Sequence, residues 1–165
     1  MCSDDAATSS PQLSADDCLF FVDRALDQMV AIVTELGDTT ANRSPDLPGA
    51  NSPYQLLTHC LGVCEYWGGA MIAGRVVERD RAAEFTAEGP VEPLAQRVQA
   101  AKAQFRRDLA SLRATAPTAA ALPKHWNPTK AERTFTQGEA LVHVVEELCQ
   151  HLGHLEITRD ILRAN

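Results

Sequence analysis

The chain is 165 residues long, with 45% hydrophobic residues, 22% charged residues and a net charge of −7. This length and composition suit one globular domain that buries its core without help from disulfides or a metal ion. Binding to the phosphate backbone of nucleic acid needs a concentrated basic face, which the acidic balance argues against, so we expect no nucleic-acid partner.

The first predicted helix follows a polar N-terminal segment. Residues 1–13 are small, polar and acidic and show no apolar periodicity, so we predict a disordered tail. Ser14, followed three residues later by Asp17, is a loose form of the capping-box pattern that begins a helix. Apolar residues then recur at helical spacing until Gly37, which predicts a helix over 15–36.

A second helix is predicted after a loop over 38–51 that is rich in proline, glycine and small polar residues. Ser52 is a favourable N-cap, and Pro53 suits the first helical position, so the helix is expected over 53–73. This is also the most apolar part of the chain. It contains an ionisable histidine and glutamate, which favours a buried bundle helix over a membrane span, so we expect no membrane partner.

A charged segment over 75–90 joins the second helix to the third, and its length predicts a crossover instead of a tight hairpin. The third helix is expected over 91–115, where apolar residues recur at helical spacing before Pro117. A fourth helix is expected over 139–163, and no segment shows strand alternation. The sequence thus predicts an all-α protein, a single four-helix bundle domain over 14–165 with a long crossover between its second and third helices.

Three side chains on these helices could together hold a divalent metal ion. Glu147 and His151 are four residues apart on the fourth helix, so their side chains project from the same face. These two residues would supply two metal ligands, and His59 on the second helix offers the third protein ligand that a catalytic zinc site needs. A lone buried histidine or an isolated Glu–His pair is also common without a metal, so residue spacing leaves both interpretations open.

Other histidines compete for the role of ligand. His143 is also four residues from Glu147, and His154 lies three residues beyond His151 on the same side of the helix. His154 is alternatively a pocket residue or a hydrogen-bond partner of a ligand. His125 lies in a loop, where a surface position is expected.

The chain has five cysteines, and an odd number without an apolar signal segment ahead of the domain predicts a reduced, cytoplasmic protein. Cys60 and Cys64 are four residues apart and could form a thiolate metal site. They are out of phase with His59, since each residue turns a helix by about 100°, so we interpret them as small buried hydrophobes. Cys149 is interpreted in the same way, and Cys2 is expected to be exposed.

Three segments carry a resemblance to a known family: SPYQLLTHC at 52–60, RDRAAEF at 79–85 and EELCQHLGHLEITRD at 146–160. They resemble the DinB/YfiT-like superfamily of metal-dependent four-helix bundles, and the resemblance extends over nearly the whole chain after the tail. It implies that His59, Glu147 and His151 are the metal ligands. Gly153 follows the last ligand as it does in that superfamily.

The glutamate at position 147 narrows the resemblance, because many members of the superfamily have histidine there. With Glu147 at this position, the chain is similar to the mycothiol-dependent maleylpyruvate isomerase branch and its mycothiol S-transferase relatives. This branch implies a zinc ion that activates a small thiol, mycothiol, for attack on a small electrophile, as in detoxification. The resemblance also implies an electrophile pocket, for which Tyr66 and Trp126 are candidates. The chain has no counterpart of the isomerase's additional C-terminal domain, so isomerase activity itself is not expected.

Two other functions are compatible with the same residues. The site could activate water in a metallohydrolase, with Glu146 or His154 as the base. The protein could instead be a non-catalytic metal-binding stress protein whose ion is structural or sensory. The sequence is compatible with either a monomer or a homodimer.

Overall fold

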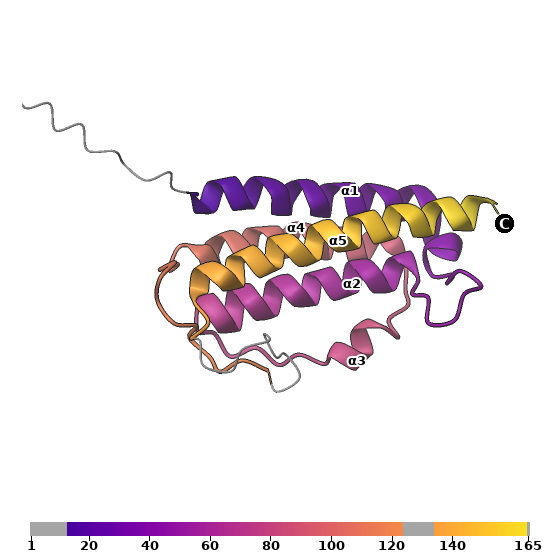
Figure 1. Ribbon diagram of the computed structural model, residues 1–165. Coiled ribbons are helices and arrows are strands. Elements are labelled where there is room, and N and C mark those ends of the chain that lie inside the picture. The colour runs from indigo at the N-terminus through magenta and orange to yellow at the C-terminus, as the bar shows by residue number, and fades with distance from the viewer. Residues whose placement is uncertain (1–12, 124–133, 165) are drawn as a thin grey trace, which may run out of the picture.

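Four long helical segments lie side by side and form the body of the protein (Figure 1). The computed structural model describes residues 13–123 and 134–164, so the predicted tail, apart from Leu13, lies outside the described residues. No strand occurs in those described ranges, which confirms the predicted all-α bundle. The helices are α1 (Ala15–Ala41), α2 (Pro53–Val63), the π-helix η1 (Cys64–Ile72), α3 (Arg81–Glu84), α4 (Val91–Leu109) and α5 (Gln137–Ala164).

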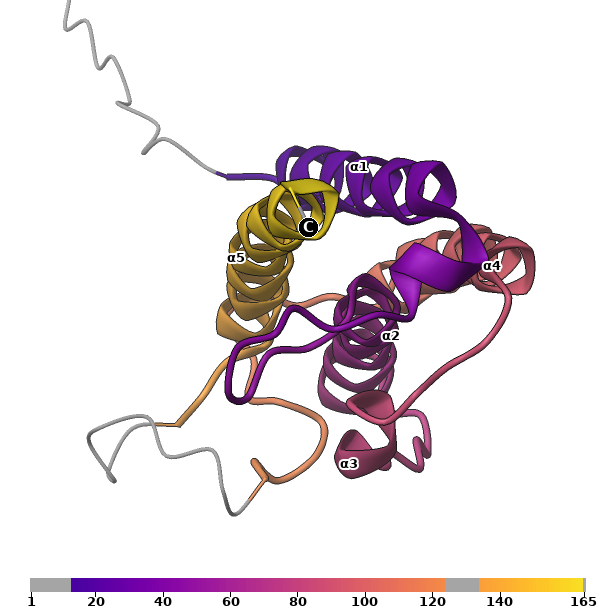
Figure 2. The same ribbon diagram turned by 90° about the vertical axis from the view of Figure 1, so that its right-hand side faces the viewer.

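The spatial order of the helices requires one long crossover. α1 and α5 run in the same direction and pack against each other, whereas α2 with η1 and α4 run in the opposite direction (Figure 1). Because α2 and α4 are parallel, the chain has to return along the length of the bundle between them. It does so through residues 73–90, with the short helix α3 packed on α2 (Figure 2), and the predicted crossover is thereby confirmed.

Both ends of this crossover are hydrogen-bonded to the bundle. At its start, the backbone N–H of Arg75 donates to the carbonyl of Gly69 at 2.8 Å, and its guanidinium donates two bonds of 2.8 Å to the Asp108 carboxylate. At its end, the Asn42 side chain donates to the Gly89 carbonyl at 2.8 Å and accepts from the Gly89 N–H at 3.0 Å. The crossover is therefore fixed at both ends.

The predicted starts of the first two helices are confirmed. Ser14 Oγ accepts a hydrogen bond from the Asp17 backbone N–H at 3.1 Å, and the Asp17 carboxylate accepts from the Ser14 backbone N–H at 2.9 Å. Ser52 caps α2 through the same reciprocal pair of bonds with Gln55, and Pro53 occupies the first turn. These bonds satisfy backbone N–H groups that the start of a helix leaves unpaired.

Two helix ends differ from the prediction. Gly37 leaves the helical conformation at a φ of 66°, as expected, but one further helical turn follows and ends at Ala41. α4 ends at Leu109, earlier than predicted, because the chain turns back to meet the start of α5. There the backbone N–H groups of Gln137 and Gly138 donate to the carbonyls of Ala116 and Ala114, each at 2.9 Å.

The second long helix has the predicted length but not the predicted geometry throughout. α2 passes into the π-helix η1 at Cys64, and the wider turns continue to Ile72. Long π-helical segments are rare and are frequently found at functional sites. η1 packs against α4 and α5, with Trp67 buried between the helices.

The hydrophobic core lies between the four long helices, and each of them contributes side chains that are fully buried. Examples are Leu26 and Met29 from α1, Leu57 from α2, Phe105 from α4 and Leu148 from α5. None of the helices in the described part of the chain is both long and apolar enough to cross a membrane.

Candidate metal centre

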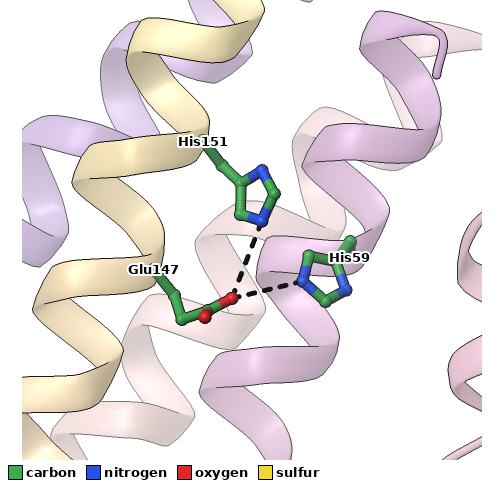
Figure 3. A group of neighbouring side chains, drawn as sticks. All are labelled: His59, Glu147 and His151. Carbon is green, nitrogen blue, oxygen red and sulfur yellow. Dashed lines mark hydrogen bonds and ion pairs between the residues drawn. The ribbon is translucent and has the colours of Figure 1, made fainter. Parts of the chain in front are cut away.

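Two neighbouring helices bring three candidate ligands together. His59 extends from α2, and Glu147 and His151 extend from successive turns of α5, which packs against α2. Figure 3 shows both imidazole rings directed at the carboxylate of Glu147. One ligand atom from each residue lies within 4.8 Å of the other two. The three side chains singled out from the sequence therefore form one cluster.

The distances within this cluster fit a shared ion better than direct hydrogen bonds. His59 Nε2 is 3.5 Å and His151 Nε2 is 3.6 Å from Glu147 Oε2. Both distances exceed the 2.7–3.2 Å range of good N–H···O bonds. The two rings stand nearly perpendicular, with centroids 4.9 Å apart. Two imidazole nitrogens and one carboxylate oxygen are a donor set typical of zinc and similar divalent metals, with one position left for a small molecule.

The cluster is buried on the α2 side and open on the α5 side. His59 is 2% exposed, whereas the side chains of Glu147 and His151 are 27% and 22% exposed. A small molecule can therefore approach the candidate ligand atoms from the α5 side without displacing the core.

Three residues of the crossover that sequence reasoning missed surround the side of His59 that faces away from Glu147. Its Nδ1–H donates to Glu84 Oε2 at 2.7 Å. Arg79 then donates to the same carboxylate through Nε and Nη2, at 2.6 and 2.9 Å. The ring of Phe85 stacks on the His59 ring with centroids 4.7 Å apart. These residues lie in the RDRAAEF segment, which entered the prediction only as part of the family resemblance.

The charges of the cluster follow from these contacts. The imidazoles of His151 and His59, which face its carboxylate, hold the pKa of Glu147 well below its usual range. Burial raises the pKa of Glu84, but hydrogen bonds from His59 and Arg79 outweigh it, so that pKa is also lowered. Burial lowers the pKa of His59, but the carboxylates of Glu147 and Glu84 beside its ring more than compensate and leave that pKa raised. Because Arg79 balances Glu84, the negative charge of Glu147 remains available to a cation.

The rival histidine of α5 lies beside the cluster. His143 Nε2 is 3.9 Å from Glu147 Oε1, the oxygen that faces away from the two other histidines. The His143 ring packs against the ring of Trp67, with the ring centroids 4.4 Å apart. His154 lies on the other side, where its exposed ring stacks on His151 with centroids 6.0 Å apart. Burial and the nearby His151 lower the pKa of His154.

The remaining candidates lie farther from the cluster or outside the described residues. The exposed Glu146 side chain accepts a hydrogen bond from Gln150 at the surface of α5. Tyr66 is half-buried, with the Arg79 guanidinium 5.7 Å from its ring centre, so it borders the residues behind His59. Trp126 and His125 lie outside the described residues.

The cysteines divide into two groups. Cys60 and Cys64 are buried, as expected, and burial raises the pKa of Cys60 well above its usual value and that of Cys64 to about 12. The prediction for Cys149 is wrong, because its side chain is exposed. Two residues turn a helix by about 200°, so a residue two positions from Glu147 faces solvent when Glu147 faces α2. Cys2 lies outside the described residues.

Comparisons with known proteins bear on the fold and on the family of the chain. No curated protein sequence matches the chain. A crystal structure of a conserved protein from Enterococcus faecalis has the same fold, with a TM-score of 0.67, and covers 94% of this chain and 100% of its own. It is only 15% identical in sequence. The sequence profile of the family described as mycothiol-S-transferase matches residues 18–164. This match confirms the resemblance drawn from the motifs, and the chain belongs to the mycothiol-S-transferase family.

Proposed function

We propose that this protein is a metal-dependent thiol S-transferase of the cytoplasm, which transfers mycothiol to a small electrophile. The observation that carries the proposal is the convergence of three ligand atoms, from His59, Glu147 and His151, within 4.8 Å in a member of this family. The donor set favours zinc, and the open position on the α5 side suits a small thiol.

The three side chains have distinct tasks in this proposal. His59 and His151 hold the ion through Nε2, and Glu147 holds it through Oε2 and contributes one negative charge. A divalent ion bound there lowers the pKa of a thiol cosubstrate and so increases the fraction of thiolate, the nucleophilic form. The exposed edges of Glu147 and His151 leave space for the thiol to reach the site.

The state of the two thiols nearest to His59 in the sequence, Cys60 and Cys64, is compatible with an external thiol as the nucleophile. Cys60, on the helix that carries His59, is fully buried, and its raised pKa keeps it protonated at neutral pH. Cys64 is buried and protonated for the same reason. Neither can attack a substrate that approaches from solvent.

No observation favours hydrolysis over thiol transfer. Glu146, a candidate base, interacts with Gln150 at the surface, and His154 is exposed beyond His151. Hydrolysis and non-catalytic metal binding are therefore alternative outcomes of the test below.

The test is an assay of thiol dependence. Zinc-loaded protein is mixed with a fluorogenic electrophile, monobromobimane, in the presence and absence of mycothiol. We expect alkylation of the thiol sulfur, with loss of bromide and of the thiol proton, above the uncatalysed rate, and no such rate with His59→Ala. Consumption of ester or amide substrates without added thiol would indicate a hydrolase. Absence of turnover on both classes of substrate would indicate a binding protein.

A further inference from the structure

The carboxylate of Glu84 packs against α2 in a site where all its interactions are satisfied. Residue Glu84 is 7% exposed, and its carboxylate accepts one hydrogen bond from His59 and two from Arg79. Burying a carboxylate is costly unless its charge and its oxygens are satisfied, and both conditions are met here. The residue is therefore built into the site and not left there by a flexible loop.

A glycine on α2 provides the space for this carboxylate. Gly62 lies one helical turn after His59, and a Cβ atom placed on it would lie 2.1 Å from Glu84 Oε1 and 2.7 Å from Glu84 Cδ. Real Cβ atoms do not approach other heavy atoms so closely. The atoms in conflict are at the flexible end of the Glu84 side chain, so a methyl group at position 62 would push the carboxylate away without moving α2.

The hydrogen bond to Glu84 determines which nitrogen of His59 faces the cluster. A neutral imidazole carries its proton on one of two nitrogens, and the bond made by one nitrogen fixes the role of the other. With Nδ1–H donated to Glu84, the lone pair of Nε2 points at Glu147 and His151. The ring of Phe85 stacks on a face of the His59 imidazole and restricts its rotation.

We propose that Glu84 is a positioning residue of the metal centre, with Gly62 providing its space and Arg79 balancing its charge. Glu84 keeps His59 in the tautomer that binds metal through Nε2 and holds the ring at the required angle. The inference rests on the metal centre of the proposed function, but not on any activity. Loss of such an outer partner typically weakens metal binding by about 10- to 100-fold.

Zinc affinity, measured by competition with a chromophoric chelator, tests the proposal in a double-mutant cycle. Glu84→Ala removes the carboxylate, and Gly62→Ala displaces it while keeping every functional group. Each substitution should weaken zinc binding by about 10- to 100-fold. The double variant should bind zinc no more weakly than Glu84→Ala alone, because Gly62→Ala has then nothing to displace. Gly153→Ala on α5 is the matched control, since its Cβ would meet no atom within 4 Å, and it should bind zinc like the parent.

A second measurement separates positioning from general stability. Long-range ¹H–¹⁵N NMR of the zinc-loaded protein should show His59 protonated at Nδ1, and this signal should shift or broaden in Glu84→Ala and Gly62→Ala but not in Gly153→Ala. Alanine favours a helix more than glycine does, so Gly62→Ala remains informative even if Glu84→Ala fails to fold.

The outcomes are distinct for each part of the argument. Zinc binding by Glu84→Ala or Gly62→Ala as tight as that of the parent would overturn the positioning role and leave the metal centre intact. Additive losses in the double variant would overturn the role given to Gly62. A parent protein that binds no zinc would refute the metal centre itself. Zinc binding without thiol transfer would refute only the proposed activity.

Discussion

The two histidines of the cluster present the same nitrogen to Glu147 but are supported differently. On α2, Nδ1 of His59 is bonded to Glu84, which Arg79 holds in turn. On α5, Nδ1 of His151 is buried and has no hydrogen-bond partner within the described residues. One ligand is fixed by a chain of tertiary contacts, and the other is fixed by its own helix.

This difference reflects how each ligand is positioned. Glu147 and His151 are four residues apart, so helix geometry alone places them together. His59 is the one residue of the cluster on α2, so its ring has to be oriented across the interface between α2 and α5. The hydrogen bond to Glu84 of the crossover provides this orientation. We infer a rigid half of the site on α2 and a more adaptable half on α5, the side from which the proposed thiol would enter.

The largest expected effects come from removing either histidine. His59→Ala and His151→Ala should each reduce bound metal from about one ion per chain to almost none, since two ligands rarely hold zinc. Elemental analysis of the purified proteins measures this. His154→Ala is the control and should keep its metal. A His151→Ala variant as rich in metal as the parent would shift the assignment to His143.

The same two substitutions should differ in their effect on folding, which sharpens the comparison. In the metal-free protein, His59→Ala leaves the buried Glu84 without one of its donors and should cost about 1–3 kcal/mol of unfolding free energy. His151→Ala removes a side chain whose Nδ1 has no hydrogen-bond partner in the described ranges, so it should lower the free energy of unfolding by less. Urea unfolding of the metal-free variants provides the measurement, and equal costs would contradict the difference between the two halves.

A change of charge on the α5 half should have a moderate effect. Glu147→His keeps three ligands, so the variant should retain metal, but the site becomes one unit more positive. The thiol should then ionise at lower pH and react more slowly as thiolate. A midpoint lowered by about one pH unit should reduce the plateau rate about threefold. An unchanged pH–rate profile in the metal-loaded variant would show that the ion does not ionise the nucleophile.

Acid titration of the metal-free protein should show a smaller effect. The pKa values of Glu147 and Glu84 lie below their usual value of 4.5, so their stabilising contribution is lost as the pH falls below that value. The pKa of His59 lies above 6.5, so its contribution is lost as the pH rises above that value. The combined contribution of these three groups should therefore be largest between these two values, and His59→Ala should remove the part of it that declines on the alkaline side. Thermal unfolding across the pH range tests this.

The smallest effect on metal binding is expected from the two buried thiols of α2 and η1. Cys60→Ser and Cys64→Ser should leave the metal content unchanged, because neither thiol belongs to the cluster. Each should lower the free energy of unfolding by about 1–3 kcal/mol, since a hydroxyl group is buried without a prepared partner. Loss of metal in either variant would place the site on a different face of α2.

Local patterns predicted much of this structure. The helix starts at Ser14 and Ser52 depend on residues three positions away, and the Glu147–His151 pair depends on helix periodicity, so a single sequence reveals them. The same periodicity, applied to Cys149, should have placed it on the solvent side of α5. The passage from α2 into a π-helix leaves no comparable signal, because apolar residues occupy both kinds of turn.

Contacts between distant segments were not predictable in this way. Glu84 is 25 residues from His59, and its role depends on the path of the crossover and on the space left by Gly62. The end of α4 depends likewise on where α5 begins. Only the likeness of the RDRAAEF segment to a known family pointed to the region, without assigning a role to any of its residues.

The fixed ends of the crossover have a consequence for how proteins of this kind can diverge. Surface connections usually tolerate insertions and deletions, but this one is tied to the bundle through Arg75 at its start and through Gly89 at its end. Glu84 sits between these two anchors, so a change in segment length would move it away from His59. A change that keeps His59 and Glu84 in contact therefore has to preserve the number of residues between the two anchors, and an engineer who grafts a new segment into this scaffold should leave the crossover intact.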